Sequence, residues 1–327
     1  MITPHTLPDL PPAAPPPATP ARLVSAATAL FDAAQAELQD GDALRAFRRL
    51  GAPLAALWTE ARGCGAADTL QAVARQHPLY AVVQQDPYTR RATDKPRGYA
   101  GDAVMMDFIY RGKAPEGSSP LGQAVFAATT RVSMGLSVRW RRQFLRSLID
   151  ETAVAVEGAR MLSVASGHCR ELDGSLVQEP WFAGEFIALD QDPLSCAEVQ
   201  QSQRSPRVRS VCQGVRELLA ESTQPLGRFD LIYSAGLYDY LSDGLARRLT
   251  ARLGAMLRPG GRLVMANFVP GGSGRGYMEL FMDWTLVLRS PTELEALARQ
   301  AGVGGVSSFV DPHRNVVYAE LTREVSA

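Results

Sequence analysis

Short apolar runs alternate with helix-like polar segments in the second half of the chain. Five of these runs predict buried parallel strands, at residues 161–164, 186–189, 208–212, 229–234 and 262–268. Two more runs, 307–310 and 316–321, flank a turn-forming segment and predict an antiparallel hairpin. The alternation predicts an α/β fold: a Rossmann-like, doubly wound sheet over residues 158–327.

The first half of the chain has helical periodicity instead. Apolar residues recur at helical spacing from residue 21 to about 83, with breaks at 40–42 and 62–65, which predicts two or three helices. A further stretch from about 121 to 154 predicts one or two long helices. Residues 21–157 are therefore expected to form an N-terminal helical cap that could help to bind a substrate. Residues 1–20 contain eight prolines and predict a disordered or polyproline tail, with a docking arm as the alternative.

The turn after the first predicted strand is the strongest candidate for a ligand site. The strand ends in Ala165, Ser166 and Gly167, and the next strand ends in Asp190, about 20 residues further on. Such an acid can accept hydrogen bonds from ribose hydroxyls. The dinucleotide-binding pattern G-x-G-x-x-G is absent from this turn, and the pattern G-x-x-x-x-G-K-[ST] of nucleoside triphosphate sites is absent from the chain. A phosphate-free adenosyl ligand such as S-adenosylmethionine therefore fits best. The alternative is an ordinary βαβ unit with a charged strand end.

Composition and charge argue against several functional classes of protein. The chain has 34 basic and 34 acidic residues, which argues against a nucleic-acid-binding surface. No apolar stretch is long enough for a membrane span, and the four cysteines form no metal or redox pattern. We expect a cytoplasmic enzyme with a small-molecule substrate and no metal. Its oligomeric state stays open, with a homodimer as one possibility.

Residues 86–102 carry mixed chemistry. Arginines, a lysine, aspartates and tyrosines lie close together with few apolar residues, as in many ligand-binding loops. Arg97 could hold a carboxylate in a two-pronged contact, and Tyr99 offers an aromatic face and a hydroxyl. The alternative is a solvated loop with local ion pairs. The arginines at 141 and 142 are interpreted as the solvated flank of a helix.

These motifs together resemble those of class I S-adenosylmethionine-dependent methyltransferases. The resemblance rests on 162–171, Asp190, 229–234 and 257–263, in that order. It implies a seven-stranded sheet with an antiparallel last strand. It also implies cofactor contacts from Ala165, Ser166, Gly167, Asp190, Gln191, Gln213, Gly214, Ser234 and Ala235.

A narrower resemblance involves residues 86–102, 234–241 and 275–279. These segments are similar to a bacterial group that includes enzymes forming a fatty-acid (3-hydroxypalmitate) methyl ester signal. The chain departs from the wider family because Ser163 replaces the usual acid and Ala165 and Cys169 replace glycines. Contacts to the methionine part of the cofactor are therefore expected from Arg97 or Asp102.

The expected reaction is methyl transfer to an oxygen, and a carboxylate acceptor would need no general base. Tyr99, Tyr238 and Asn267 are the candidate catalytic residues, with an arginine of the 90–97 segment as carboxylate anchor. The alternative is cyclisation of S-adenosylmethionine to azetidine-2-carboxylate with release of methylthioadenosine. A third possibility is a ligand-binding module without catalysis.

Overall fold

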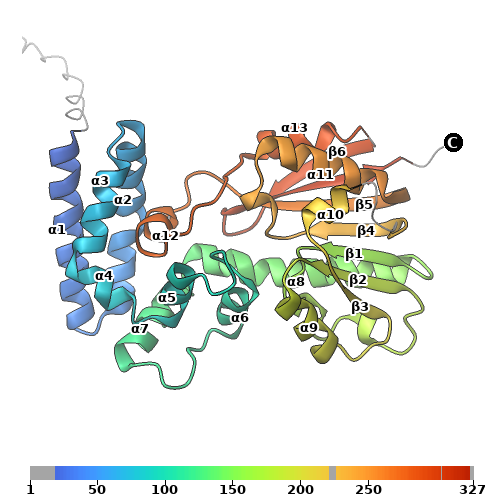
Figure 1. Ribbon diagram of the computed structural model, residues 1–327, viewed down its shortest axis with the longest axis horizontal. Helices are drawn as coiled ribbons and strands as arrows, with labels where there is room; N and C mark the ends of the chain where they lie inside the picture. Colours follow the sequence, from blue (N-terminus) through green and yellow to red (C-terminus); the bar gives the residue numbers. More distant parts are fainter. Residues whose placement is uncertain (1–18, 221–225, 303, 325–327) are drawn as a thin grey trace, which may run out of the picture.

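The computed structural model describes residues 19–220, 226–302 and 304–324. Figure 1 shows a helical region at one end of the molecule and a sheet flanked by helices at the other. The predicted Pro-rich tail lies almost wholly outside the described residues, and its last residue, Pro20, already opens the first helix.

From residue 19 onward, eight helices precede the sheet, and their bounds are α1 (Pro20–Gln39), α2 (Ala43–Gly63), α3 (Ala67–Gln76), α4 (Pro78–Val83), α5 (Pro87–Asp94), α6 (Ala103–Arg111), α7 (Pro120–Thr129) and α8 (Ser133–Ala155). Both predicted breaks, at 40–42 and 62–65, separate helices. The sequence predicted two or three helices up to residue 83, whereas the structure has four there, because His77 and Pro78 divide the last segment into α3 and α4.

Part of the predicted loop at residues 86–102 is helical, which corrects that expectation. Asp86 caps α5 by accepting hydrogen bonds from the backbone N–H groups of Tyr88 and Thr89, and Pro87 fills the first helical position. The side of α5 that carries Tyr88, Thr89 and Ala92 is buried. The connection between α5 and α6, residues 95–102, is the true loop.

The sheet has seven strands in the order β3-β2-β1-β4-β5-β7-β6. Their bounds are β1 (Arg160–Val164), β2 (Glu185–Asp190), β3 (Val208–Cys212), β4 (Phe229–Ser234), β5 (Leu257–Phe268), β6 (Gly304–Val310) and β7 (Val316–Arg323). Strands β1 to β5 pair in parallel, and β7 is antiparallel to both β5 and β6. The predicted doubly wound α/β fold with an antiparallel last strand is confirmed.

The remaining helices complete the layers around the sheet: α9 (Pro193–Ser202), α10 (Val215–Leu219), α11 (Asp243–Ala255), α12 (Arg275–Phe281) and α13 (Pro291–Arg299). The described residues also form short 3₁₀ turns at η1 (Arg170–Leu172), η2 (Leu176–Gln178) and η3 (Tyr238–Tyr240). Although α12 follows the fifth strand in sequence, it packs against α2 in the helical region (Figure 1). No helix in the described part of the chain is both long and apolar enough to cross a membrane.

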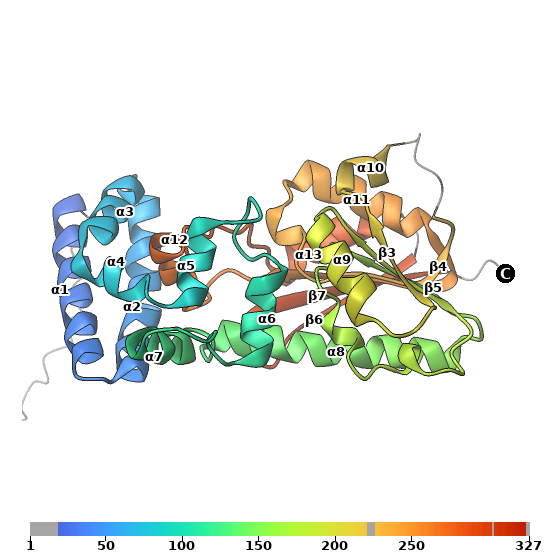
Figure 2. The same ribbon diagram turned by 60° about the horizontal axis from the view of Figure 1, so that its bottom comes forward.

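Alternate residues along each strand belong to different cores. Met161, Phe186 and Tyr233 pack in the core that includes α8 and the N-terminal helices. Leu162 and Ile232 pack in a second core with α11 and α13. This period of two follows from the pleat of a strand. Helix α8 runs from the helical region along the sheet (Figure 2), so one continuous apolar core joins both parts.

Candidate functional site

The strand order reverses between β1 and β4, and a cavity opens there at the carboxyl ends of the parallel strands. Strands β2 and β3 lie on one side of β1, whereas β4 and β5 lie on the other. Ligands of open α/β sheets bind at such a switch point. The cavity has a volume of about 430 Å³, and we call it the sheet-edge cavity. Its lining includes nine of the predicted cofactor-contact residues: Arg97, Ala165, Ser166, Gly167, Asp190, Gln191, Gln213, Gly214 and Ala235.

The turn after β1 has three residues in the left-handed backbone conformation that favours glycine, but only one of them is glycine. Ala165, Gly167 and Cys169 have φ angles of 55°, 55° and 49°. An L-residue in this left-handed region costs about 1–2 kcal/mol relative to its usual conformation. The structure therefore accepts strain at Ala165 and Cys169 to hold a conformation that brings the backbone close to the cavity.

Asp190 lines the sheet-edge cavity although it is only 5% exposed. Its carboxylate accepts hydrogen bonds from the backbone N–H groups of Gly167 at 2.7 Å and Asp192 at 2.9 Å. Burial raises the pKa of Asp190, and these two hydrogen bonds offset the effect only in part. A carboxylate oxygen can accept more than one hydrogen bond, so Asp190 can also accept bonds from the hydroxyls of a ribose.

The helical cap forms the opposite wall of this cavity through residues 97–101. Arg97 is already engaged, because its Nη1 lies 2.7 Å from the carboxylate of Asp192 and 3.0 Å from the hydroxyl of Ser195. It therefore fastens the loop to the start of α9, and the expected role as a substrate carboxylate anchor receives no support from this pairing. Tyr99 lies edge-on to Tyr240, with ring centroids 6.2 Å apart. Burial raises the pKa of Tyr99, so its phenol is neutral and can donate a hydrogen bond.

A polar network fixes the same wall to the turn after β1. Asp107 on α6 accepts hydrogen bonds from Arg170 at 2.8 Å and contacts Nδ1 of His168 at 3.0 Å. Burial by itself would raise the pKa of Asp107, but Arg170 and His168 outweigh it and hold that pKa well below its usual range. His168 thus has three structural neighbours at its ring nitrogens: Asp107, Arg97 and Arg170.

Opposite charges line the inner part of the sheet-edge cavity. Arg141 of α8 is 5% exposed, donates from Nη1 to the carbonyl of Ala235 at 2.6 Å, and has no partner for Nε among the described residues. Glu171 is also buried and accepts a hydrogen bond from the hydroxyl of Tyr233 at 2.5 Å. The buried hydroxyl of Ser166 lacks a partner within the described ranges. A buried anion and a hydroxyl without a described partner can hold a positively charged amino group, Asp190 can hold a ribose, and the buried cation can hold a carboxylate.

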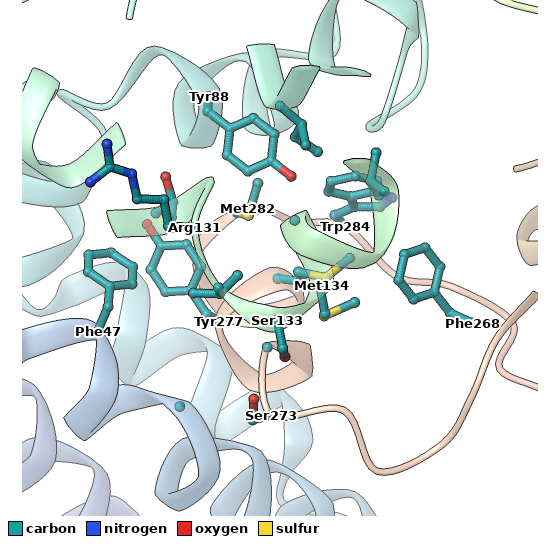
Figure 3. A pocket seen from close by; sticks show the side chains of 18 of the residues that line it. Phe47, Tyr88, Arg131, Ser133, Met134, Phe268, Ser273, Tyr277, Met282 and Trp284 are labelled. Atoms are coloured by element: carbon teal, nitrogen blue, oxygen red, sulfur yellow. The ribbon is translucent and has the colours of Figure 1, made fainter. Parts of the chain in front are cut away.

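A second cavity of about 510 Å³ lies between the sheet edge and helices α2, α7, α8 and α12. We call it the helical cavity. Figure 3 shows its aromatic and methionine side chains, among them Phe47, Tyr88, Met134, Tyr277 and Trp284. The Tyr88 hydroxyl makes no hydrogen bond to a residue in the described part of the chain. Burial raises the pKa of Tyr88, so the phenol is a neutral donor. Such a lining suits an apolar ligand.

The two cavities share five lining residues: Gly101, Met106, Arg141, Gly236 and Tyr240. Gly101 has a φ of 76°, and a Cβ atom there would lie 2.3 Å from the Trp284 ring and 2.6 Å from the Tyr240 hydroxyl. That hydroxyl accepts from Trp284 Nε1 and donates to the carbonyl of Ala100. Only glycine therefore lets the cap loop approach these rings, and the cavities meet beside them at Arg141.

Four of the predicted site residues do not line either cavity, and each is held elsewhere. Tyr238, expected beside a sulfonium, is fully buried in the second core, where its hydroxyl lies 2.9 Å from that of Thr250. Asn267 is also buried and is bonded to Arg289 and the carbonyl of Val287. These two placements correct the expectation of a catalytic contact.

The other two residues support the backbone instead. Asp102 caps α6 through the N–H of Met105 and pairs with Arg91 at 2.7 Å. The Ser234 hydroxyl donates to the carbonyl of Val164 at 3.1 Å and so joins β4 to β1. The structure does not bring either side chain to the cavity that their motifs surround.

Sequence reasoning missed Arg141, which it had interpreted as part of a solvated flank. The helical periodicity contained the signal, because the buried positions of α8 include Val138, Arg141, Leu145 and Leu148. Spacings of three and four residues place Arg141 on the apolar stripe, and a charged residue at a stripe position marks a functional or paired cation.

Comparisons with known proteins agree with the fold. No protein-family model matches the chain, and no curated protein matches it. Among solved structures, a possible exported protein from Bordetella parapertussis superposes with a TM-score of 0.57, at 18% identity, over 69% of this chain and 80% of that one.

Two weaker likenesses have methyltransferase names. An O-methyltransferase family protein from Burkholderia thailandensis has a TM-score of 0.46 at 16% identity, over 62% of this chain and 63% of its own. Magnesium protoporphyrin IX methyltransferase from Synechocystis, solved with bound SAM, has a TM-score of 0.40 at 12% identity, over 58% and 83%. At these identities the likeness concerns the fold alone.

Proposed function

We propose that this chain is an S-adenosylmethionine-dependent methyltransferase that methylates a carboxylate oxygen of an apolar small-molecule acid. The observation that carries the proposal is the pair of adjoining cavities. One contains the ribose-type acid Asp190 beside the turn at Gly167, the other is largely apolar, and both reach the buried cation Arg141. An adenosyl ligand in the first cavity and an apolar acid in the second would meet at this cation.

Different residues of the sheet-edge cavity would contact different parts of the cofactor. Asp190 would accept from the ribose hydroxyls, Glu171 would face the ammonium group, and the rings of Tyr99 and Tyr240 would face the sulfonium. A cation beside aromatic faces is stabilised by the negative potential of the rings. Bound S-adenosylmethionine would supply an electrophilic methyl carbon on a positively charged sulfur.

Arg141 and Tyr88 would hold the acceptor. The guanidinium of Arg141 lines both cavities and attracts a carboxylate. The neutral Tyr88 phenol can donate a second hydrogen bond from the apolar wall. A carboxylate is already deprotonated at neutral pH, so a new C–O bond can form as the C–S bond breaks without loss of a proton. This explains why a methyltransferase could act here without a histidine base in the helical cavity.

The size of the helical cavity favours an external acceptor over cyclisation of the cofactor, which would need only a small polar pocket. Two of the side chains considered for cyclisation, Tyr238 and Asn267, lie in the packed interior. The helical cavity has no role in a reaction of the cofactor with itself.

The adenosyl by-product formed from the cofactor distinguishes methyl transfer from cyclisation. The protein is incubated with S-adenosylmethionine alone and with a series of apolar carboxylic acids, and the adenosyl product is identified by mass spectrometry. We expect S-adenosylhomocysteine and a methyl ester only when an acid is present, and neither from the Asp190→Ala variant. Methylthioadenosine formed without an acceptor would refute methyl transfer in favour of cyclisation. Failure to bind S-adenosylmethionine in calorimetry would indicate a module without this chemistry.

A further inference from the structure

The helical cavity has an unbalanced charge on its wall. Its lining includes three arginines, Arg48, Arg131 and Arg141, but only one acid, Asp239, which is buried. Burial raises the pKa of Asp239 to about 7, so its negative charge is weak at neutral pH. The lining therefore has more positive than negative charge although most of its surface is apolar.

Arg48 and Arg131 differ from their neighbours because they lack partners. The side chain of neither residue makes a hydrogen bond or ion pair with any residue in the described ranges. By contrast, Arg45 and Arg49 on the same helix as Arg48 both pair with Glu37, at 3.0 and 2.6 Å. Thus Arg45 and Arg49 share a carboxylate, whereas Arg48, which lines the cavity, pairs with none among the described residues.

The positive charge of Arg131 also acts on Arg139, a nearby arginine of α8 that does not line the cavity. The pKa of Arg139 is lowered, first by burial and then by repulsion from Arg131. Arg139 donates to the carbonyl of Ile109 and faces no carboxylate among the described residues. An anion near Arg131 would relieve this repulsion.

These two arginines lie away from the place where the cavities meet. Arg48 belongs to α2, and Arg131 follows α7; both are exposed and both line the cavity, so they stand where it opens to solvent. In Figure 3, Arg131 and Phe47 lie on one side of the cavity, and Phe268 and Trp284 lie on the other. Apolar side chains, including Met134 and Tyr277, occupy the wall between them.

We propose that the acceptor is an elongated apolar molecule with an anionic group at each end, in the simplest case an α,ω-dicarboxylic acid. This inference rests on the proposed function: Arg141 holds the carboxylate that is methylated, and Arg48 and Arg131 hold the second anion. Guanidinium groups match carboxylates in two-pronged contacts, which favours them at such an end. The product is a monoester, because the methyl group passes from sulfur to one carboxylate oxygen and the far carboxylate remains free.

The test compares saturated monocarboxylic acids with α,ω-dicarboxylic acids of the same chain length, from decanoic to hexadecanoic. Dissociation constants are measured by calorimetry on the full chain saturated with S-adenosylhomocysteine, and ester formation is measured separately. The variants are Arg48→Gln, Arg131→Gln and the double substitution. Arg248→Gln on α11 is the matched control, because it also removes an exposed charge, and Arg248 lines neither cavity.

We expect diacids to bind about fivefold more tightly than monoacids, and the double variant to lose about that factor for diacids only, as for two partly solvated ion pairs. The Arg248→Gln control should change neither series. Equal binding of both series to the unaltered protein, or an equal loss for both in the double variant, would overturn the second anion site. If diacids bind more tightly than monoacids but no ester forms, the second anion site is supported and methylation is refuted. If no acid binds, both proposals fail.

Discussion

Replacement of Arg141 by glutamine is the most direct perturbation of the place where the two cavities meet. The substitution removes a charge that is 5% exposed and whose Nη1 lies 2.6 Å from the carbonyl of Ala235. Loss of one partner from a buried, hydrogen-bonded charge pair costs about 2–5 kcal/mol. If the pair forms between Arg141 and the acceptor carboxylate, a loss near 3 kcal/mol lowers kcat/KM for the acid by about two orders of magnitude.

The structure also predicts a side effect on neighbouring acids. The positive charge of Arg141 lowers the pKa of both Glu171 and Asp239, although burial raises these pKa values more. Without the cation, both acids should take up protons at higher pH than they do now. The Ala235 carbonyl would lose its donor, which costs about 1–3 kcal/mol of stability unless the glutamine amide replaces it.

The assay measures the effect of the substitution on the acid and on the cofactor separately. Initial rates are measured while the acid is varied at saturating S-adenosylmethionine, and calorimetry gives the affinity for the cofactor alone. Arg146→Gln is the matched control, since Arg146 lies on the same helix, pairs with Asp150 and lines neither cavity. Arg141→Lys should recover part of the activity because it retains the charge without the two-pronged geometry. A loss of cofactor affinity with unchanged KM and kcat for the acid would refute the assignment to the acceptor.

Three further predictions concern the cofactor site and the fold. Asp190→Ala should weaken S-adenosylmethionine binding about 100-fold in calorimetry, because two hydrogen bonds to a charged group are lost; unchanged affinity would exclude ribose binding there. Ala165→Gly should raise the free energy of unfolding by up to about 1 kcal/mol in urea titrations, because glycine adopts its φ of 55° without strain. The reverse sign would mean that the turn is not strained. The pKa of Asp239 is raised by burial to about 7, so the folded state binds a proton that the unfolded state releases above about pH 4. This contribution to stability is complete below pH 4 and falls as the pH rises to 7. The Asp239→Asn variant lacks this contribution. The free energy of unfolding of the unaltered protein, relative to that of the variant, should therefore fall by up to about 4 kcal/mol between pH 4 and pH 7. A difference that stays constant over this range would contradict the raised pKa.

The strands and the cofactor edge could be predicted from sequence because both depend on local patterns. An apolar run that ends in small residues fixes where a strand stops, and the carboxyl ends of parallel strands share one edge. Hence Gly167 and Asp190, 23 positions apart in the numbering, meet through a 2.7 Å hydrogen bond. The same reasoning fails for Tyr238, because η3 turns that side chain into the second core and composition does not specify the direction.

The helical cavity could not be predicted, because its wall combines segments that are distant in sequence. Phe47, Tyr88, Met134, Phe268 and Tyr277 come from five separate elements or their flanks. Each of them looks like an ordinary core residue in its own segment. Only the packing of α12 against α2 brings the last of these beside the first, with Phe47 and Tyr277 ring centroids 4.9 Å apart.

The shared core explains why the cofactor and acceptor sites should not be separable. The sheet begins near residue 158, yet Met161 and Tyr233 of the sheet pack in the same core as Leu145 of α8 and Phe126 of α7. Removal of the first 157 residues would expose this face and remove Arg141, together with the cap wall at 97–101. A change in the cap therefore acts on both ligands at once: it alters the acceptor cavity directly, and it alters the cofactor cavity through Arg141 and the loop that Arg97 fastens to α9. Selectivity for the acceptor and affinity for the cofactor should consequently vary together among substitutions at this boundary, whereas substitutions on the α11 side should leave both unchanged.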